Sequence, residues 1–228
     1  MRKGVGRMRP AEGGLRERQK AQRRARILDA TRELLRENPE SVISAERIAR
    51  RAGVAPATVY NLIGPREKIW EALAAGFTDR LERRLAASAR GTAGGTVDGT
   101  AGGAVDPREV VVATVRLFVS DPVVSRRMVR EWEASGLVFR RSPLTQLRRA
   151  MADARDRGLL RADVDTGALA AAVATSCVGV LHQWVAGLID DDRFCAHAVF
   201  ALDVALAAAA AAPHRDRFLA PLLVRGAA

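Results

Sequence analysis

Aromatic residues and cysteines are both scarce in this chain of 228 residues. Only 4% of the residues are aromatic although 48% are hydrophobic, so alanine supplies much of the apolar content. An apolar fraction rich in alanine suits closely packed helices. Cys177 and Cys195 are the only cysteines. Two isolated cysteines in a chain of this size predict buried, reduced thiols of a cytoplasmic protein, with a disulfide as the alternative.

Long hydrophobic runs are scarce as well. The longest unbroken one, Val204 to Ala212, is mostly alanine and is too short to cross a bilayer. Residues 166–189 contain no Asp, Glu, Lys or Arg, but they include His182 and Gln183 and are again rich in alanine. We expect this segment to be a buried helix of a soluble protein, with a membrane span as the alternative. The basic N-terminus has no apolar core, so it does not predict a secretory signal.

Alternation of apolar and polar residues with a period of two is absent, and the sequence therefore predicts no sheet. Apolar residues recur at helical spacing, and Asp, Pro and Gly mark the helix ends. Residues 106–109, Asp-Pro-Arg-Glu, combine an N-cap, a first-turn proline and a capping-box glutamate. The predicted fold class is all-α. Besides two short helices within residues 44–66, we expect helices at about 15–37, 66–88, 107–120, 122–136, 143–158, 166–188 and 190–212.

Residues 44–66, SAERIARRAGVAPATVYNLIGPR, have the spacing of two short helices joined by a tight turn. Ile48 and Ala52 are four residues apart and share one face of the first helix. Gly53 follows that helix, where glycine adopts a left-handed conformation with little strain. Val59 and Leu62 are three residues apart and seat the second helix on the first. The segment predicts a helix-turn-helix, and a helical hairpin in an ordinary core is the alternative.

The outward face of the second helix is small, polar and uncharged, as suits a helix in the DNA major groove. We expect Tyr60 to contact a phosphate, and Thr58 and Asn61 to read bases. The alternative for Tyr60 is that it covers the edge of the motif. The alternative for Thr58 and Asn61 is that they are neutral surface residues. Ser44 can cap the first helix and bond a phosphate, and Arg66 in a helix first turn also suggests a nearby phosphate. The candidate DNA-binding residues are Ser44, Ala55, Pro56, Thr58, Tyr60, Asn61 and Arg66.

Positive charge is concentrated beside this motif. The formal net charge is +11, and residues 1–88 hold 20 Lys and Arg against 11 Asp and Glu, compared with 17 against 15 in residues 89–228. Residues 1–14 predict a disordered basic arm. In one interpretation, this arm and the start of the following helix lie on the phosphate backbone of DNA or reach into its minor groove. In the other, they form a solvated leader with no partner.

The expected organisation has three parts: the basic arm, a helix-turn-helix domain at 15–65, and a helical domain at 66–228. Residues 91–98 and 99–106, GTAGGTVD and GTAGGAVD, form a tandem repeat that differs at one position. With six glycines and no aromatic residue, the repeat predicts a flexible loop at 89–106.

Several short segments together resemble the DNA-binding signature of the TetR family of transcriptional regulators. They are Ile48-Ala49, Ala52-Gly53-Val54, Thr58-Val59-Tyr60 and residues 64–69, Gly-Pro-Arg-Glu-Lys-Ile. The resemblance covers about residues 23–85, and a looser one involves GLLRADVD at 158–165 with Gly179 and Trp184. It implies an all-helical homodimer whose N-terminal three helices bind DNA and whose C-terminal helices bind a small effector and dimerise. It also implies phosphate contacts for Tyr60 and Arg66.

The chain departs from the family pattern at three positions of the motif. A serine is usual where Ala55 stands, so the recognition helix lacks a side-chain cap. Phenylalanine is usual where Ile63 stands, and Pro56 replaces a residue that often contacts DNA.

In the second half we expect an effector pocket for a small, largely apolar molecule, with core packing as the alternative for each residue. The candidates are Phe118, Met128, Trp132, Cys177, Val180, His182 and Trp184. We expect no cofactor and no metal, because neither Cys195 and His197 nor Cys177 and His182 are spaced to share an ion on a helix. No nucleophile elbow or phosphate loop is present, so we expect no enzymatic activity.

Small residues along the last two long helices permit close helix approach, and we expect them to form much of a dimer interface. They are Ala168, Ala171, Ala172, Thr175 and Gly179, followed by Ala201, Ala205, Ala208 and Ala209. The sequence thus predicts a cytoplasmic homodimeric transcriptional repressor that binds a palindromic operator in double-stranded DNA, does not contact membranes and is released by an effector. A non-specific architectural DNA-binding protein and a helical enzyme with a regulatory DNA-binding head are the alternatives.

Overall fold

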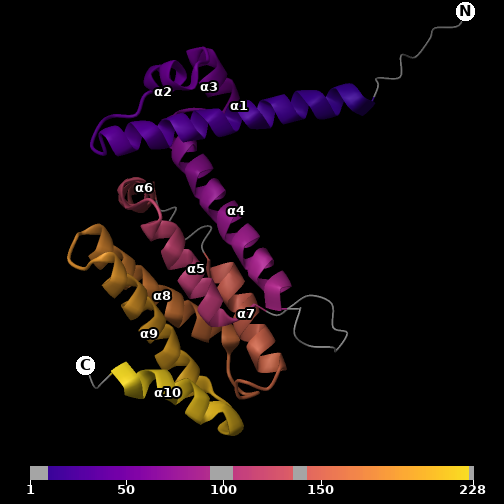
Figure 1. Ribbon diagram of the computed structural model, residues 1–228, viewed down its shortest axis with the longest axis vertical. Helices are drawn as coiled ribbons and strands as arrows, with labels where there is room; N and C mark the ends of the chain where they lie inside the picture. The colour runs from indigo at the N-terminus through magenta and orange to yellow at the C-terminus, as the bar shows by residue number, and fades with distance from the viewer. Residues whose placement is uncertain (1–9, 93–104, 136–142, 226–228) are drawn as a thin grey trace, which may run out of the picture. The chain divides into compact units, whose positions relative to one another are not determined.

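The computed structural model describes residues 10–92, 105–135 and 143–225, and these residues are helical apart from short connections (Figure 1). Within the described residues the only extended pairing is an isolated antiparallel bridge between Leu160 and Ala210. The all-α prediction is therefore confirmed. The chain divides into two units, Met1–Leu73 and Ala74–Ala228. The division falls within a helix, eight residues after the boundary that the sequence suggested.

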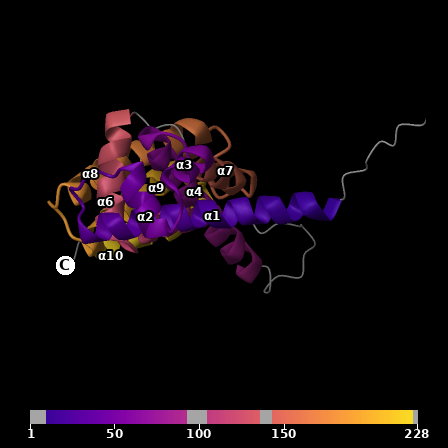
Figure 2. The ribbon, with the colours of Figure 1, turned by 90° about the horizontal axis from the view of Figure 1, so that it is seen from above.

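The N-terminal unit contains α1 (Pro10–Glu37), α2 (Ala45–Ala52), α3 (Pro56–Leu62) and the first part of α4 (Arg66–Thr92). Both short helices pack on α1, near its C-terminal half (Figures 1 and 2). The core of the unit is aliphatic. It consists of Ile27, Leu28, Ala30, Leu34, Leu35, Ile43, Ile48, Ala49, Val59 and Ile69, with Thr31 and Trp70.

The first helix begins earlier than expected. It starts at Pro10 rather than near Leu15, so residues 10–14 are helical where the sequence suggested disorder. The physical reason is that proline in a first turn needs no hydrogen-bond donor and has its φ already fixed for the helix. Residues 1–9 of the expected arm lie outside the described residues.

In its described residues, the C-terminal unit contains the rest of α4 and six further α-helices. They are α5 (Pro107–Val119), α6 (Pro122–Ser135), α7 (Leu144–Asp156), α8 (Thr166–Val185), α9 (Asp191–Ala209) and, after a 3-10 turn at Ala212–His214, α10 (Arg215–Arg225). Helix α4 continues to Thr92, so residues 89–92 are not part of the loop expected at 89–106. Residues 93–104 of that loop lie outside the described residues.

Aspartates begin four of these helices, as their positions in the sequence predict. For α6, Asp121 accepts a hydrogen bond from the backbone N–H of Val124 at 3.5 Å. Asp106 accepts a hydrogen bond from the backbone N–H of Arg108 at 2.8 Å, and Asp190 accepts one from Arg193 at 2.8 Å. Asp165 accepts two, from the N–H groups of Gly167 and Ala168. Each carboxylate satisfies backbone donors that have no partner within the helix and lies at the positive end of the helix dipole.

Aromatic side chains from five helices form the centre of the C-terminal unit. The Phe77 and Phe118 rings lie 4.6 Å apart, and Trp132 meets Phe77 edge-on at 6.3 Å. Trp184 stacks on Phe194 at 5.1 Å, and both rings also lie near Phe118. Five of the chain's ten aromatic residues are thus gathered where α4, α5, α6, α8 and α9 meet.

Helix α8 differs from its expected form as a buried helix. It is long and apolar enough to span a membrane, yet only 22% of its most apolar window is buried. One face packs on α7 and α9, while the other, which includes Ala168, Ala172 and Gly179, is exposed in the single chain. Length and composition are weak evidence for a membrane span, because they do not distinguish a span from a helix that packs on another protein surface.

Candidate nucleic-acid interface

The turn between α2 and α3 has the geometry that the sequence predicts. Ser44 is the N-cap of α2, and its Oγ accepts a hydrogen bond from the N–H of Arg47 at 3.3 Å. Gly53 ends the helix with φ 64° and ψ 42°, in the left-handed region. The N–H of Val54 then bonds to the Ala49 carbonyl at 3.0 Å. A side chain at position 53 would strain this backbone, which is why glycine fits there.

The predicted packing of the two helices is also present. Ile48 and Val59 are completely buried, and Ala49 is 1% exposed. Ala49 lies where a larger side chain would separate the helices. The short α3 is therefore held by its apolar side, and its opposite side remains available to a partner.

The outward face of α3 carries most of the candidate DNA-binding residues. Ala55, Pro56 and Asn61 are exposed, Tyr60 is 53% exposed, and Thr58 is half-buried. Ala55 is the N-cap and makes no side-chain hydrogen bond, as expected from the missing serine. No acidic or basic residue lies in α3. A helix with short uncharged side chains lets its backbone approach the edges of base pairs closely.

The two remaining candidates lie at the edges of this face. Ser44 is half-buried and its hydroxyl is engaged locally: the pKa of Glu46 lies below its usual value because of the glutamate's own backbone N–H and, next, the Ser44 hydroxyl. Arg66 is exposed at the start of α4. Ser44 thus acts as the cap of α2, while the other candidates lie on α3, at its N-cap or at the start of α4.

Two arginines of α1 hold the motif in a way that the sequence did not reveal. The Arg24 guanidinium donates to the carbonyl of Leu62, the last residue of α3, at 2.9 Å. Arg26 donates to the carbonyl of Ala52, the last residue of α2, also at 2.9 Å. The last carbonyls of a helix have no partner within it, so a cation there satisfies them and favours the helix dipole. From the sequence alone, both arginines belonged to the basic helix start that follows the arm, and nothing distinguished them from cations that would meet phosphates.

Ion pairs join α2 to α1 on another side. Arg51 contacts Glu37 at 2.7 Å and Glu33 at 3.3 Å. The hydrogen bond from Arg51 holds the pKa of the Glu37 carboxyl below its usual value. These exposed pairs contribute little stability each, but together they orient α2 against the long helix.

The candidate effector residues are divided between core and surface. Phe118, Met128, Trp132 and Trp184 are at most 7% exposed and belong to the central packing of the C-terminal unit. Cys177 and Val180 are half-buried, and His182 is exposed. The structure therefore brings the aromatic candidates together but does not place His182 among them.

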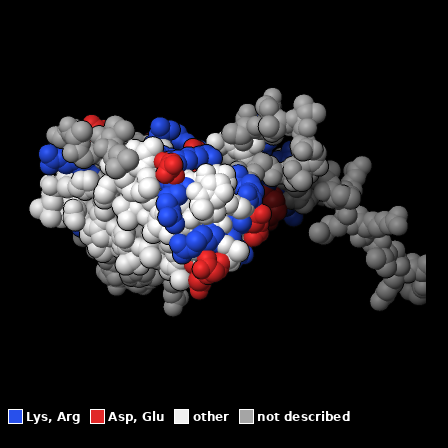
Figure 3. All heavy atoms as spheres, turned by 90° about the horizontal axis from the view of Figure 1, so that it is seen from below, with Lys and Arg blue, Asp and Glu red and all other residues white. Residues whose placement is uncertain are grey.

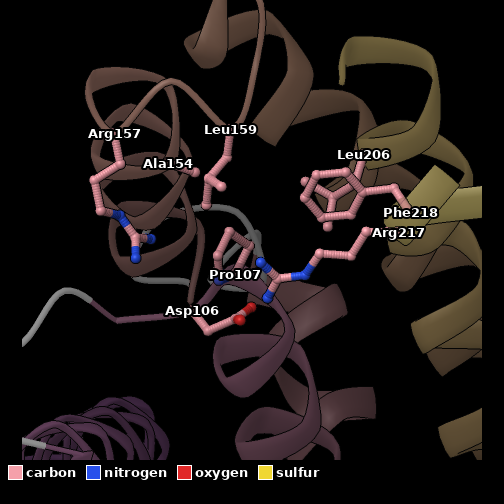
Figure 4. A pocket seen from close by; sticks show the side chains of 8 residues that line it. All are labelled: Asp106, Pro107, Ala154, Arg157, Leu159, Leu206, Arg217 and Phe218. Carbon is pink, nitrogen blue, oxygen red and sulfur yellow. The ribbon is translucent and has the colours of Figure 1, made fainter. Parts of the chain in front are cut away.

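A small cavity of about 150 Å³ lies elsewhere in the C-terminal unit, among the ends of α5, α7, α9 and α10 (Figure 4). It contains none of the candidate effector residues. Its lining is Asp106, Pro107, Ala154, Arg157, Leu159, Leu206, Arg217 and Phe218. The cavity at the helix ends is therefore separate from the core in which Phe118 and Trp184 pack.

Charges are mixed on the face shown in Figure 3, where Lys and Arg side chains lie among Asp and Glu side chains and uncharged areas. Such a face does not have the single-sign potential that attracts a polyanion. No group of three His, Cys, Asp or Glu residues suited to a metal ion occurs in the described part of the chain.

Comparisons with known proteins point to one class of protein. Residues 27–62 match the family described as bacterial regulatory proteins, tetR family. The structure is similar to that of SmeT, the repressor of the Stenotrophomonas maltophilia multidrug efflux pump SmeDEF. The two share 24% identity over 83% of this chain and 91% of that one, with a TM-score of 0.57. No curated protein matches the sequence.

Two further structures have the same fold. A putative TetR-family transcriptional regulator from a Rhodococcus species is 19% identical over 81% of this chain and 99% of its own, with a TM-score of 0.55. A SmeT–triclosan complex gives 23% identity over 83% and 92% of the two chains, with a TM-score of 0.55. The fold and the motif define a helix-turn-helix DNA-binding protein. More particularly, residues 27–62 match the model of the tetR family, in agreement with the family resemblance of the sequence.

Proposed function

We propose that this protein is a sequence-specific transcriptional regulator, a homodimeric repressor that a small, largely apolar effector releases from a palindromic operator. The observation that carries the proposal is the exposed, uncharged face of α3, held on α1 through its buried side. Two such helices related by a dimer axis enter successive major grooves, so the operator is an inverted repeat. The protein is cytoplasmic in this account, as its DNA partner requires.

The DNA contacts are divided by chemistry. Tyr60 and Arg66 bond phosphates and fix the position of the unit, while Thr58 and Asn61 face base edges. Asparagine pairs with adenine through two hydrogen bonds, and the methyl group of threonine contacts that of thymine. Ala55 and Pro56, at the start of α3, keep that end of the helix small enough for close approach.

Dimerisation uses the exposed faces of α8 and α9. Ala168, Ala172 and Gly179 leave a smooth surface on α8, and Phe200 and Val204 of α9 are 44% and 45% exposed. An apolar face of this kind is expected to be covered by a partner. Ala209, which the sequence placed in the same interface, is 4% exposed and packs within its own chain.

Effector binding belongs to the C-terminal unit. The SmeT–triclosan complex provides an example of a similar fold in complex with triclosan. Phe118, Met128, Trp132 and Trp184 supply apolar and aromatic surface for such a molecule, and Cys177, Val180 and His182 lie on the side toward the surface. Binding to one of two subunit arrangements shifts the population toward it, which changes the spacing of the recognition helices.

Exchange of Tyr60 tests the proposal directly. We expect Tyr60→Ala and Tyr60→Phe both to weaken binding to labelled duplex DNA about tenfold, because a hydroxyl–phosphate hydrogen bond contributes about 1.5 kcal/mol. Val123→Ala, at a position 39% exposed on α6 in the C-terminal unit, is the control and should bind as the wild type does. Equal affinities for all four proteins, measured by fluorescence anisotropy, would contradict the assigned contact.

An architectural DNA-binding protein and a helical enzyme remain the alternatives. The first predicts little sequence preference and a steep dependence of affinity on salt. The second predicts turnover of a substrate by the purified protein.

A further inference from the structure

The N-terminal half of α1 projects beyond the helices that pack on its other half (Figures 1 and 2). Residues 15–26 are all exposed, whereas Ile27 is completely buried. In the described residues 14–26, six Lys and Arg accompany one acidic residue, Glu17. A stretch of helix with this much exposed positive charge attracts a polyanion.

Three of these cations form a stripe on a defined side of α1. Arg16, Lys20 and Arg23 follow the i, i+4, i+7 spacing of one helix face. Continued along the helix, the same spacing reaches Ile27 and Leu34, which are buried where α2 and α3 pack. The stripe therefore lies on the same side of α1 as the helix-turn-helix.

The contact between Arg24 and Leu62 fixes where the stripe begins. Arg24 reaches the end of α3, so Arg23 lies next to that point and Lys20 and Arg16 lie beyond it. At 1.5 Å per residue, the stripe from Arg23 to Arg16 is about 10 Å long, which corresponds to roughly three base pairs of DNA. Arg16 and Arg23 make no hydrogen bond or ion pair with any other described residue.

The composition of this stretch also decides the kind of partner. Between residues 15 and 26 the apolar side chains are Leu15 and two alanines, Ala21 and Ala25. This is too little apolar surface for insertion into a bilayer or for a coiled coil. Arginine and lysine without an apolar face suit phosphate oxygens, and the stripe continues the surface that carries α3.

We propose that Arg16, Lys20 and Arg23 bind DNA phosphates outside the half-site that α3 reads, so that each protomer has an extended footprint. This inference rests on the proposed function, because DNA must first dock on α3. The extension adds affinity without adding sequence preference, since phosphates carry no sequence information. Arg24 and Arg26 are excluded from it because they hold α3 and α2.

The test removes negative charge from the DNA in one arm and positive charge from the protein in the other. The operator would be recovered from random DNA with the wild-type protein and prepared in two forms. One is unmodified, and the other carries uncharged methylphosphonate linkages at three flanking positions on each side. The triple variant Arg16→Gln, Lys20→Gln and Arg23→Gln is compared with Arg18→Gln, which removes a charge from the opposite side of α1. Circular dichroism confirms that the variants fold.

We expect the wild type and Arg18→Gln to bind the methylphosphonate duplex on the order of tenfold more weakly than the unmodified one at 0.1 M salt. The triple variant should bind both duplexes equally, and its salt dependence should fall by about 2.7 in log–log slope per protomer. If the methylphosphonate linkages weaken binding of the wild type and of the triple variant by the same factor, the proposed phosphate contacts outside the half-site are wrong. Failure to recover any operator would instead count against the proposed function.

Discussion

The indole Nε1 of Trp184 donates a hydrogen bond to Asp191 Oδ1 at 2.7 Å, and this bond joins the end of α8 to the start of α9. Trp184 is completely buried, and the Arg126 guanidinium lies 4.7 Å from the centre of its ring. The bond lets a tryptophan with a polar atom sit in the aromatic core without an unsatisfied donor. It also fixes the pair of helices on which the proposed dimer interface lies.

Replacement of Asp191 should therefore destabilise the protein. Asp191→Ala leaves the buried indole N–H without its acceptor, and we expect the free energy of unfolding to fall by about 2 kcal/mol. Asp192→Ala is the matched control, because it removes the same charge from the same helix turn without touching Trp184. Urea denaturation compares the two variants. Equal losses would mean that only the helix dipole is involved and would contradict the role of the hydrogen bond.

The proposed dimer interface is tested at Gly179. This glycine lies in α8, is exposed, and has nothing within 4 Å of where a Cβ would be in the single chain. Gly179→Leu should leave the fold intact and separate the dimer, because a large side chain prevents close approach of two small-residue faces. Analytical ultracentrifugation measures the change. Asp79→Leu, which adds the same side chain to an exposed position on α4, should stay dimeric.

A variant of Gly179 that remains fully dimeric at micromolar concentration would show that this face of α8 is not the interface. The predicted behaviour of the wild type is a stable dimer at that concentration.

Burial raises the pKa of the Cys177 thiol to about 11, from 9.0. Only the thiolate reacts with alkylating agents, so at pH 8 folded Cys177 should react about a hundredfold more slowly than in the unfolded chain. Because the folded state holds this proton more tightly, its contribution to stability is intact below pH 9 and is lost as the pH rises to 11. Iodoacetamide labelling of a Cys195→Ser variant, with and without urea, measures the difference. Similar rates in both conditions would contradict the burial effect.

Base reading is tested at Asn61 once an operator is known. Asn61→Ala should relax the preference at one or two positions of each half-site, by about 1 to 3 kcal/mol per base pair. Binding to DNA of unrelated sequence should stay the same, because the contact does not involve phosphates. A uniform loss over all sequences would assign Asn61 to the backbone instead. The measurement is competition binding against duplexes with single base changes.

The helix-turn-helix was predictable because its determinants are local. Gly53 follows Ala52 directly, and Ile48, Ala49 and Val59 lie within a dozen residues of one another, so their spacing alone specifies the packing. The aspartate caps of α5, α8 and α9 were predictable for the same reason. In each of them the carboxylate bonds a backbone N–H two or three residues ahead.

Features that depend on distant contacts were not predictable. Arg24 and Leu62 are 38 residues apart, and nothing in the local sequence distinguishes Arg24 from Arg23 beside it, which we propose binds a phosphate. Helix α10 was missed because the expected last helix ended at Pro213 and because Pro221 lies inside α10.

The candidate effector site illustrates a further limit of the sequence. Helical spacing correctly predicted that Phe118, Met128, Trp132 and Trp184 face the interior. Spacing does not determine whether inward-facing side chains fill a space or enclose one, because that depends on the distances between helices. The assignment of these residues to an effector pocket stays a prediction.

The central claim is that the protein reads a palindromic operator. Its most direct test is selection of bound fragments from random duplex DNA by the purified protein at physiological salt. The account predicts an enriched inverted repeat whose half-sites are about one helical turn apart, or a multiple of it, and which the dimer occupies. Recovery of no enriched sequence, with binding that disappears as the salt concentration rises, would contradict the account and favour an architectural DNA-binding protein.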